Sequence, residues 1–383
     1  MRASDRGHLN EAGDDGPSDA RQDGGMTSAA LTPLSLDDAA ALWDVTPGFL
    51  DSCSYGPPPR PAWTAMQRSL DEWRAGAGPW QPWAESVDAS RALFGRLVGV
   101  DADDVATGAT VSQLLAPVAA ALPDGATVLV PDIEFTSGVF PFAVHRDRGI
   151  RVRTAPLAGL ADAIDETTTL VSFSAAQSAT GEVADIAAIT EQARAAGAVT
   201  HMDATQAAGW LPIDGMAVDF LTCHAYKWLC APRGTTFMTL HPSLADRQPE
   251  FASRLKPLAA GWYSAAAGAY YGMPLRLAEG ARSFDISPAW HSWVGTAPAL
   301  EVLLRVGVAE IHRHDLALAN AFRAGVGVPP SDSAIVSVAL PDGAAERLRA
   351  GGIRFTVMDG RVRVAFHLYT TQADVDAALD ALN

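Results

Sequence analysis

The segment that decides the expected fold runs over residues 200–235, THMDATQAAGWLPIDGMAVDFLTCHAYKWLCAPRGT. It opens as an apolar strand that ends on an acid, Asp203, and a second apolar strand over 218–223 leads directly to Lys227. A break rich in proline and glycine follows, and then a third strand over 234–240. In an open α/β sheet, ligands bind beyond the carboxyl ends of the strands. We therefore expect Asp203 and Lys227 to converge on one ligand.

This pair of residues fits the chemistry of one class of cofactor. A lysine can hold an aldehyde as a Schiff base, and a pyridoxal ring acts as an electron sink while its ring nitrogen stays protonated. A buried carboxylate beside that nitrogen keeps the proton there. The sequence thus predicts two catalytic residues, Lys227 as the Schiff-base lysine and Asp203 as that carboxylate, with pyridoxal 5'-phosphate as the cofactor. Taken alone, each has an ordinary alternative, a helix cap for the aspartate and a solvated surface for the lysine.

The order of these motifs resembles the class V aminotransferase family. The matching pattern is D-x-x-Q, an apolar strand, then H-x-Y-K with P-x-G nearby. The family includes cysteine desulfurases, kynureninase and isopenicillin-N-epimerase-like proteins, all fold-type-I pyridoxal-phosphate enzymes. The resemblance covers residues 50–382 and implies an α/β fold, a large domain with a mostly parallel central sheet and a small C-terminal α+β domain. The alternation of strands and helices over 128–240 favours the same kind of sheet.

The expected organisation has three parts. Residues 1–30 are predicted to form a disordered acidic tail, because they are rich in Asp, Gly, Ser and Arg and hold no apolar core of a signal peptide. Residues 31–260 would form the large cofactor-binding domain, in which 31–56 line the site, and residues 261–383 the small domain. Met26 is an alternative to Met1 as the start of the chain, and equal activity of a chain that begins at Met26 would support it.

A turn of small residues over 105–112 precedes a helix whose apolar spacing begins at Leu114. Such a turn gathers free backbone N–H groups and the positive end of the helix dipole, which together form a seat for phosphate. The resemblance implies that Ala109, Thr110 and Val111 bind the cofactor here. A threonine that only caps the helix is the ordinary alternative.

The resemblance assigns four further cofactor contacts to residues at or after strand ends. Phe135 would stack on the pyridine ring, and Gln206 would contact its phenolic oxygen. His224 and Tyr226 would reach the phosphate, because one offers a ring N–H and the other a hydroxyl. For Phe135 and His224, ordinary core positions are the alternative.

A hairpin strand after the turn Asp359-Gly360 carries Arg363. In the resembled family an arginine in R-x-x-x-x-Y binds the substrate α-carboxylate, and RVAFHLYT is close to that motif. The planar guanidinium suits a carboxylate, whereas a surface arginine is the alternative. The resemblance also places Gln177 or Ser178, with the register uncertain by one, against the phenolic oxygen or the substrate.

Composition limits the partners and the compartment. The formal net charge of −16 argues against nucleic acid as a partner. No stretch approaches the ~20 apolar residues of a membrane span, and no spacing of Cys and His suggests a metal site. Three cysteines fit a reducing, cytoplasmic compartment. By resemblance we expect a homodimer, in which Trp262 or, more weakly, Ser287 reaches the cofactor phosphate of the neighbouring subunit.

The reaction is less determined than the cofactor. Desulfurases of the resembled family use a cysteine in the C-terminal third, and no cysteine follows Cys230 here, which disfavours that mechanism. The simplest expectation is an aminotransferase acting on a carboxylated amino acid through Lys227. Alternatives are a C–S lyase, a kynureninase-like hydrolase, an epimerase and a non-catalytic pyridoxal-binding regulator. The sequence does not identify the substrate.

Overall fold

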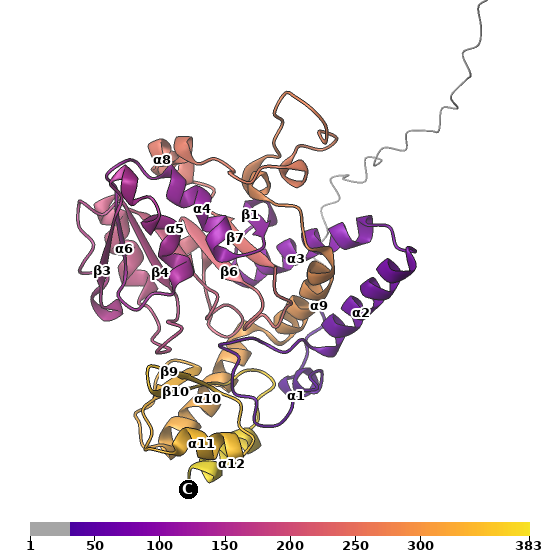
Figure 1. The fold of residues 1–383 in the computed structure, drawn as a ribbon, viewed down its shortest axis with the longest axis vertical. Coiled ribbons are helices and arrows are strands. Elements are labelled where there is room, and N and C mark those ends of the chain that lie inside the picture. Colours follow the sequence, from indigo (N-terminus) through magenta and orange to yellow (C-terminus); the bar gives the residue numbers. More distant parts are fainter. Residues whose placement is uncertain (1–30) are drawn as a thin grey trace, which may run out of the picture.

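The computed structural model describes residues 31–383. The predicted tail over 1–30, and the choice between Met1 and Met26, lie outside the described residues. The fold is α/β, as expected, with a seven-stranded sheet in the order β1-β7-β6-β5-β4-β2-β3 (Figure 1). The strands are β1 (Val105–Gly108), β2 (Thr127–Pro131), β3 (Arg151–Ala155), β4 (Leu170–Ser174), β5 (Val199–Asp203), β6 (Phe220–His224) and β7 (Thr236–Leu240).

The sheet is mostly parallel, which confirms the prediction. Strands β2 to β6 pair in parallel, whereas β7 runs antiparallel to both of its neighbours, β6 and β1. The register pairs Ser174 with Asp203 and Asp203 with Thr222, so the carboxyl ends of β4, β5 and β6 finish at one edge. That edge is where a ligand is expected in such a sheet.

Helices cover both faces of the sheet, because its strands alternate side chains between two apolar cores. Leu129 of β2 faces one core, whereas Val128 and Val130 face the other. The first core is closed by α3 (Gln81–Val98), α6 (Ile186–Ala196) and α9 (Trp290–Val306). The second is closed by α4 (Val111–Ala121), α5 (Phe140–Ala143) and α8 (Pro249–Arg254), with the short α7 (Leu244–Arg247) before it.

The N-terminal helices are α1 (Leu36–Ala40) and α2 (Arg60–Ala75). Ser35 caps α1 by accepting from the backbone N–H of Asp38, as expected for a serine before a helix. Helix α9 lies within the part predicted as the small domain, yet it packs against α2 and α3. By these contacts, α9 is part of the same unit as the N-terminal helices. The domain boundary at residue 261 stays a prediction.

The C-terminal part has its own antiparallel sheet in the order β8-β10-β9 (Figure 1). Its elements are α10 (Val308–Gly325), β8 (Ile335–Val338), α11 (Ala344–Ala350), β9 (Thr356–Met358), β10 (Arg361–Ala365) and α12 (Gln372–Leu382). Asp359 and Gly360 have φ of 48° and 75°, as in a type I′ turn, so the expected hairpin turn forms here. The buried Leu50 joins this small core from the N-terminal segment. Among residues 31–383, no helix combines the length and apolar character needed to cross a membrane.

Candidate active site

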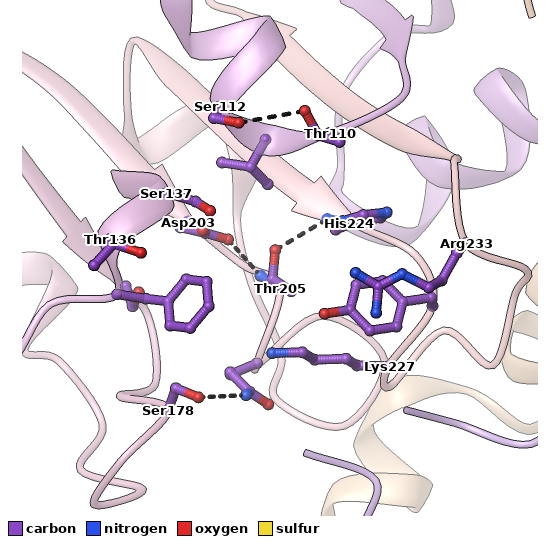
Figure 2. Close-up of a pocket in the computed structure, with 15 residues that line it drawn as sticks. Thr110, Ser112, Thr136, Ser137, Ser178, Asp203, Thr205, His224, Lys227 and Arg233 are labelled. Carbon is purple, nitrogen blue, oxygen red and sulfur yellow. Dashed lines mark hydrogen bonds between the residues drawn. The ribbon is translucent and has the colours of Figure 1, made fainter. Parts of the chain in front are cut away.

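A cavity of about 300 Å³ opens at the carboxyl ends of β5 and β6 (Figure 2). The parallel sheet explains its position, because neighbouring strands end there and the chain leaves the sheet in separate loops. Its wall consists of Thr110, Val111, Ser112, Phe135, Thr136, Ser137, Ser174, Ser178, Asp203, Thr205, Gln206, His224, Tyr226, Lys227 and Arg233. Nine of the sequence-predicted site residues meet here, namely Thr110, Val111, Phe135, Ser178, Asp203, Gln206, His224, Tyr226 and Lys227.

Asp203 and Lys227 share this cavity, as their places at two strand ends led us to expect. Asp203 is the last residue of β5, and its Oδ1 accepts from the backbone N–H of Thr205 at 2.8 Å. Burial raises the pKa of the Asp203 carboxyl to about 6. Burial also lowers the pKa of the Lys227 amine, whose Nζ lies 5.5 Å from the centre of the Phe135 ring. Both shifts bring these groups closer to proton exchange near neutral pH.

The turn that carries Lys227 is held from two directions. The backbone N–H of Gly56 donates to the carbonyl of Tyr226 at 2.8 Å, and a Cβ at Gly56 would lie 1.9 Å from the carbonyl oxygen of Lys227. The imidazole Nε2 of the buried His367 donates to the carbonyl of Trp228 at 2.8 Å. The N-terminal segment thus lies directly against the lysine turn, and only glycine at position 56 permits that approach.

A polar seat forms where α4 begins. Thr110 is the N-cap of α4, and its hydroxyl accepts from the backbone N–H of Gln113 at 3.2 Å. His224 faces the same cavity with a buried Nε2 that has no hydrogen-bond partner in the described part of the chain. Burial lowers the pKa of His224 to about 4, so its ring is neutral near pH 7. A helix N-terminus and an unpartnered buried imidazole nitrogen together suit an anion.

Two residues predicted to contact cofactor lie off the wall. The backbone N–H of Ala109 donates to Oε1 of Gln113 at 3.0 Å. The indole of Trp262 donates to Ser287 Oγ at 3.1 Å and packs edge-on against Trp80, with ring centres 5.9 Å apart. A role for Trp262 or Ser287 across a subunit boundary stays a prediction.

The structure separates the two neighbours whose register was uncertain. Ser178 lines the cavity, whereas the buried Gln177 donates from Nε2 to Glu134 at 3.0 Å. Gln206 is fully engaged, since its Nε2 donates to Ser178 Oγ at 2.9 Å and its Oε1 accepts from the indole of Trp228 at 2.8 Å. Ser178 is therefore the better placed of the pair for a ligand.

Arg363 is buried beside the cavity, so the alternative of a surface arginine is wrong. Only 4% of it is exposed. Its guanidinium donates to the carbonyl of Ser178 at 2.6 Å and to Ser54 Oγ at 3.3 Å, and it lies 4.0 Å from Asp51 Oδ1. Arg363 therefore touches the wall through Ser178 without lining it.

Several wall residues escaped the sequence analysis. Ser112, Thr136, Ser137 and Thr205 lie within two residues of predicted positions, so proximity in sequence was the available signal. Arg233 lies in the P-R-G break after the lysine, which we treated only as a motif marker. Glu134 is off the wall but organises it, because it accepts from the backbone N–H of Ser174 at 2.7 Å and from the backbone N–H of Phe135 at 2.8 Å.

Residues 81–330, more than half of the chain, match the family described as Aminotransferase class-V. The chain belongs to the class-V aminotransferase family. It is 28% identical to an uncharacterized aminotransferase, YcbU, of Bacillus subtilis, over 87% of this chain and 93% of that protein. It is 29% identical to isopenicillin N epimerase of Streptomyces clavuligerus, over 89% and 96% of the two chains. A cystine C-S lyase in complex with cysteine persulfide has the same fold, with a TM-score of 0.78 and 20% identity over 88% of this chain and 97% of that one.

The cofactor of this family is pyridoxal phosphate, and the cavity fits it. A lysine amine and a carboxyl share one wall, and the seat at the start of α4 suits the phosphate. Among residues 31–383, no group of His, Cys, Asp and Glu side chains is arranged to hold a metal ion. The individual roles of the residues stay predictions.

Proposed function

We propose that this protein is a pyridoxal-phosphate enzyme that acts on a carboxylated amino acid, in the simplest case an aminotransferase. The observation that carries the proposal is the meeting of Lys227 and Asp203 on one cavity, next to a seat for phosphate. The similarity to an aminotransferase over most of both chains supports the choice of reaction.

When bound, pyridoxal phosphate supplies an electron sink for negative charge at the α-carbon of an amino acid. Asp203 holds a proton at the ring nitrogen, and its own charge is available above pH ~6 because burial raises its pKa. Lys227 moves the proton at the substrate α-carbon, and its lowered pKa makes Nζ a better base near neutral pH. Phe135, 48% exposed on the wall, covers the ring face.

Arg363 binds the substrate carboxylate in this proposal. Its charge is partly balanced by Asp51 at 4.0 Å, and its contact with Ser178 directs it towards the wall. A carboxylate beside Ser178 would share the guanidinium with Asp51. The planar guanidinium suits a carboxylate, and its buried Nε has no hydrogen-bond partner among the described residues.

Epimerisation is the second candidate, because isopenicillin N epimerase is similar over nearly its whole length. A C–S lyase or a kynureninase-like hydrolase uses the same first proton transfer and differs in later steps. Sulfur transfer to a protein thiolate has little support, since Cys53, Cys223 and Cys230 are all buried.

We also propose that the enzyme is a cytoplasmic homodimer. Its free, buried cysteines fit a reducing compartment. The loop between Ala265 and Leu277, which form an isolated bridge, exposes 91% of Tyr271 and 84% of Met273. Apolar side chains this exposed favour a partner surface, and sedimentation of the purified protein as a dimer is the expected result.

The chain contains two lysines, Lys227 and Lys256, which makes the decisive test simple. Borohydride reduction of the purified holoenzyme should fix the pyridoxyl group on Lys227, as located by peptide mass spectrometry. Lys227→Ala should abolish both the label and the pyridoxal absorbance, whereas Lys256→Ala, a change at an exposed position, should leave them intact. Label on Lys256, or no label on the wild type, contradicts the proposal.

An amino-acid panel then separates the reactions. Pyridoxamine indicates transamination, inversion at the α-carbon indicates epimerisation, and pyruvate with a released thiol or ammonia indicates elimination. A protein that binds the cofactor and leaves every amino acid unchanged would support the regulator alternative.

A further inference from the structure

The phosphate end of the cavity needs a positive charge. A phosphate ester carries about −1.5 to −2 near neutral pH, and the N-terminus of α4 offers only about +0.5. His224 is neutral there, because burial lowers its pKa to about 4. The cationic side chains on the wall are Lys227 and Arg233. Since Lys227 serves the aldehyde in the proposed function, Arg233 is the wall residue that can balance the phosphate.

The position of Arg233 is set by stacking. Its guanidinium carbon lies 4.2 Å from the centre of the Tyr226 ring, and Tyr226 packs edge-on against His224 with ring centres 4.4 Å apart. Arg233, His224 and Thr110 border the cavity on the side away from Ser178 (Figure 2). Stacking on an aromatic face orients a planar guanidinium without using its N–H donors. The donors therefore stay available to a ligand.

Arg233 also differs from the arginines with structural partners. Arg91 and Arg363 are buried and face Asp285 and Asp51, respectively. Arg233 has an exposed side chain, and the ion pairs within residues 31–383 do not include it. Its charge is therefore not neutralised by a neighbouring carboxylate in the described part of the chain.

We propose that Arg233 binds the phosphate group of the cofactor and thereby sets the preference of this protein for pyridoxal phosphate over unphosphorylated pyridoxal. The inference rests on the proposed function and adds a residue to it. Arg233 contributes the charge, the start of α4 contributes backbone N–H groups, and His224 contributes a neutral ring nitrogen. The proposed phosphate site at the start of α4 then has its cation, Arg233, from the same subunit.

The test compares two aldehydes that differ only in the phosphate. Dissociation constants for pyridoxal phosphate and pyridoxal are measured with full-length protein freed of cofactor, as wild type, Arg233→Gln and Arg233→Lys. Arg233→Gln should raise the dissociation constant for pyridoxal phosphate about 10- to 100-fold, the usual range for a lost hydrogen bond to a charged group. Pyridoxal should change by less than about twofold, because it lacks the group that Arg233 contacts. For Arg233→Lys, the dissociation constant for pyridoxal phosphate should lie between those of wild type and Arg233→Gln, since lysine keeps the charge and loses the planar stack.

Arg194→Gln is the matched control, since it removes one charge from an exposed residue in the last turn of α6, off the cavity wall. It should leave both constants unchanged. Inorganic phosphate, as a second probe, should compete with pyridoxal phosphate in the wild type and compete more weakly in Arg233→Gln.

Two results would overturn the inference. Equal weakening of both aldehydes would show that Arg233 acts on the ring or the fold, and unchanged binding of pyridoxal phosphate would show that another group, such as one from a second subunit, supplies the cation. Thermal unfolding of cofactor-free Arg233→Gln, compared with wild type, checks that the variant is folded. If the wild type itself binds neither aldehyde through Lys227, the proposed function fails, a result distinct from failure of the Arg233 contact.

Discussion

At the scale of single residues, the carboxyl of Asp203 shows a conflict between stability and chemistry. It is 6% exposed, and burial raises its pKa from an ordinary 3.8 to about 6. In the cofactor-free protein, the charged Asp203 carboxylate therefore lowers the free energy of unfolding above pH ~6. Groups in such surroundings gather at sites of chemistry, which agrees with the role proposed here.

Asp203→Asn should separate these two effects. Turnover should fall by several orders of magnitude, because an amide cannot hold the ring-nitrogen proton. Cofactor-free Asp203→Asn should be more stable than wild type near neutral pH, by up to about 3 kcal/mol for a shift of roughly two pKa units. Because the pKa of Asp203 is raised in the folded protein, wild type loses this stability only when the carboxyl ionises. The loss is absent below pH ~4, grows from there to pH ~6 and is complete above pH ~6. Urea unfolding across that range measures it.

Thr205→Ala is a useful comparison, since its backbone N–H still donates to Asp203 Oδ1. It loses the Thr205 side-chain hydrogen bond, which lowers the pKa of Asp203, so that pKa should rise further and the pH dependence of stability should grow. A constant difference between wild type and Asp203→Asn at every pH would contradict the assigned pKa of Asp203.

At the scale of elements, the three central strands are joined by side chains as well as by their backbone. His201 on β5 is fully buried, with Nδ1 2.8 Å from Ser172 Oγ on β4 and Nε2 2.9 Å from Thr222 Oγ on β6. Burial lowers the pKa of His201 to about 3. The sheet therefore carries a histidine that must stay neutral while folded.

This histidine should make the sheet acid-sensitive. Because its folded pKa is lower than its ordinary 6.5, the unfolded chain takes up a proton first as the pH falls. The free energy of unfolding should drop by about 2 kcal/mol between about pH 7 and about pH 5 from this residue alone. His201→Gln keeps a side chain that can hydrogen bond on both sides, so it should lose that part of the slope. Equal slopes in the two proteins would show that another group titrates.

At the scale of the whole molecule, a buried ion pair connects parts that are far apart in sequence. Asp285 is fully buried, with Oδ2 2.6 Å from Arg91 Nη2 on α3. Its Oδ1 accepts from the backbone N–H of Thr107 on β1 at 2.8 Å. The segment before α9 is thus attached to the strand that leads into α4, the helix whose start is the proposed phosphate site. Removing one member of such a pair leaves the other charge buried.

Asp285→Ala should therefore lower the free energy of unfolding by about 3–5 kcal/mol, measured by chemical denaturation. Asp44→Ala is the control, because its pair with Arg60 has a similar distance, 3.0 Å, but is largely exposed. It should change stability by no more than about 1 kcal/mol. Similar effects of the two substitutions would contradict the assignment of Asp285 as a structural anchor.

Local sequence determined much of this protein. Helix α6 ends at Ala196 and is capped by Gly197 with φ of 71°, and Thr371 and Asp374 form a capping box at the start of α12. These features depend on atoms within a few residues of each other, so they can be predicted from the sequence. The strand-end positions of Asp203 and Lys227 belong here too, since apolar runs mark the strands and parallel pairing aligns their ends.

Only the tertiary structure decided which distant groups meet. It assigned Val105–Gly108 to an edge strand, buried Arg363 against Asp51, and placed Arg233 on the cavity wall above Tyr226. None of these contacts has a local signature, because each depends on how whole elements pack and on which charges that packing removes from water. The chain by itself therefore determined the elements and the chemistry at their ends, whereas packing decided the neighbours that tune that chemistry.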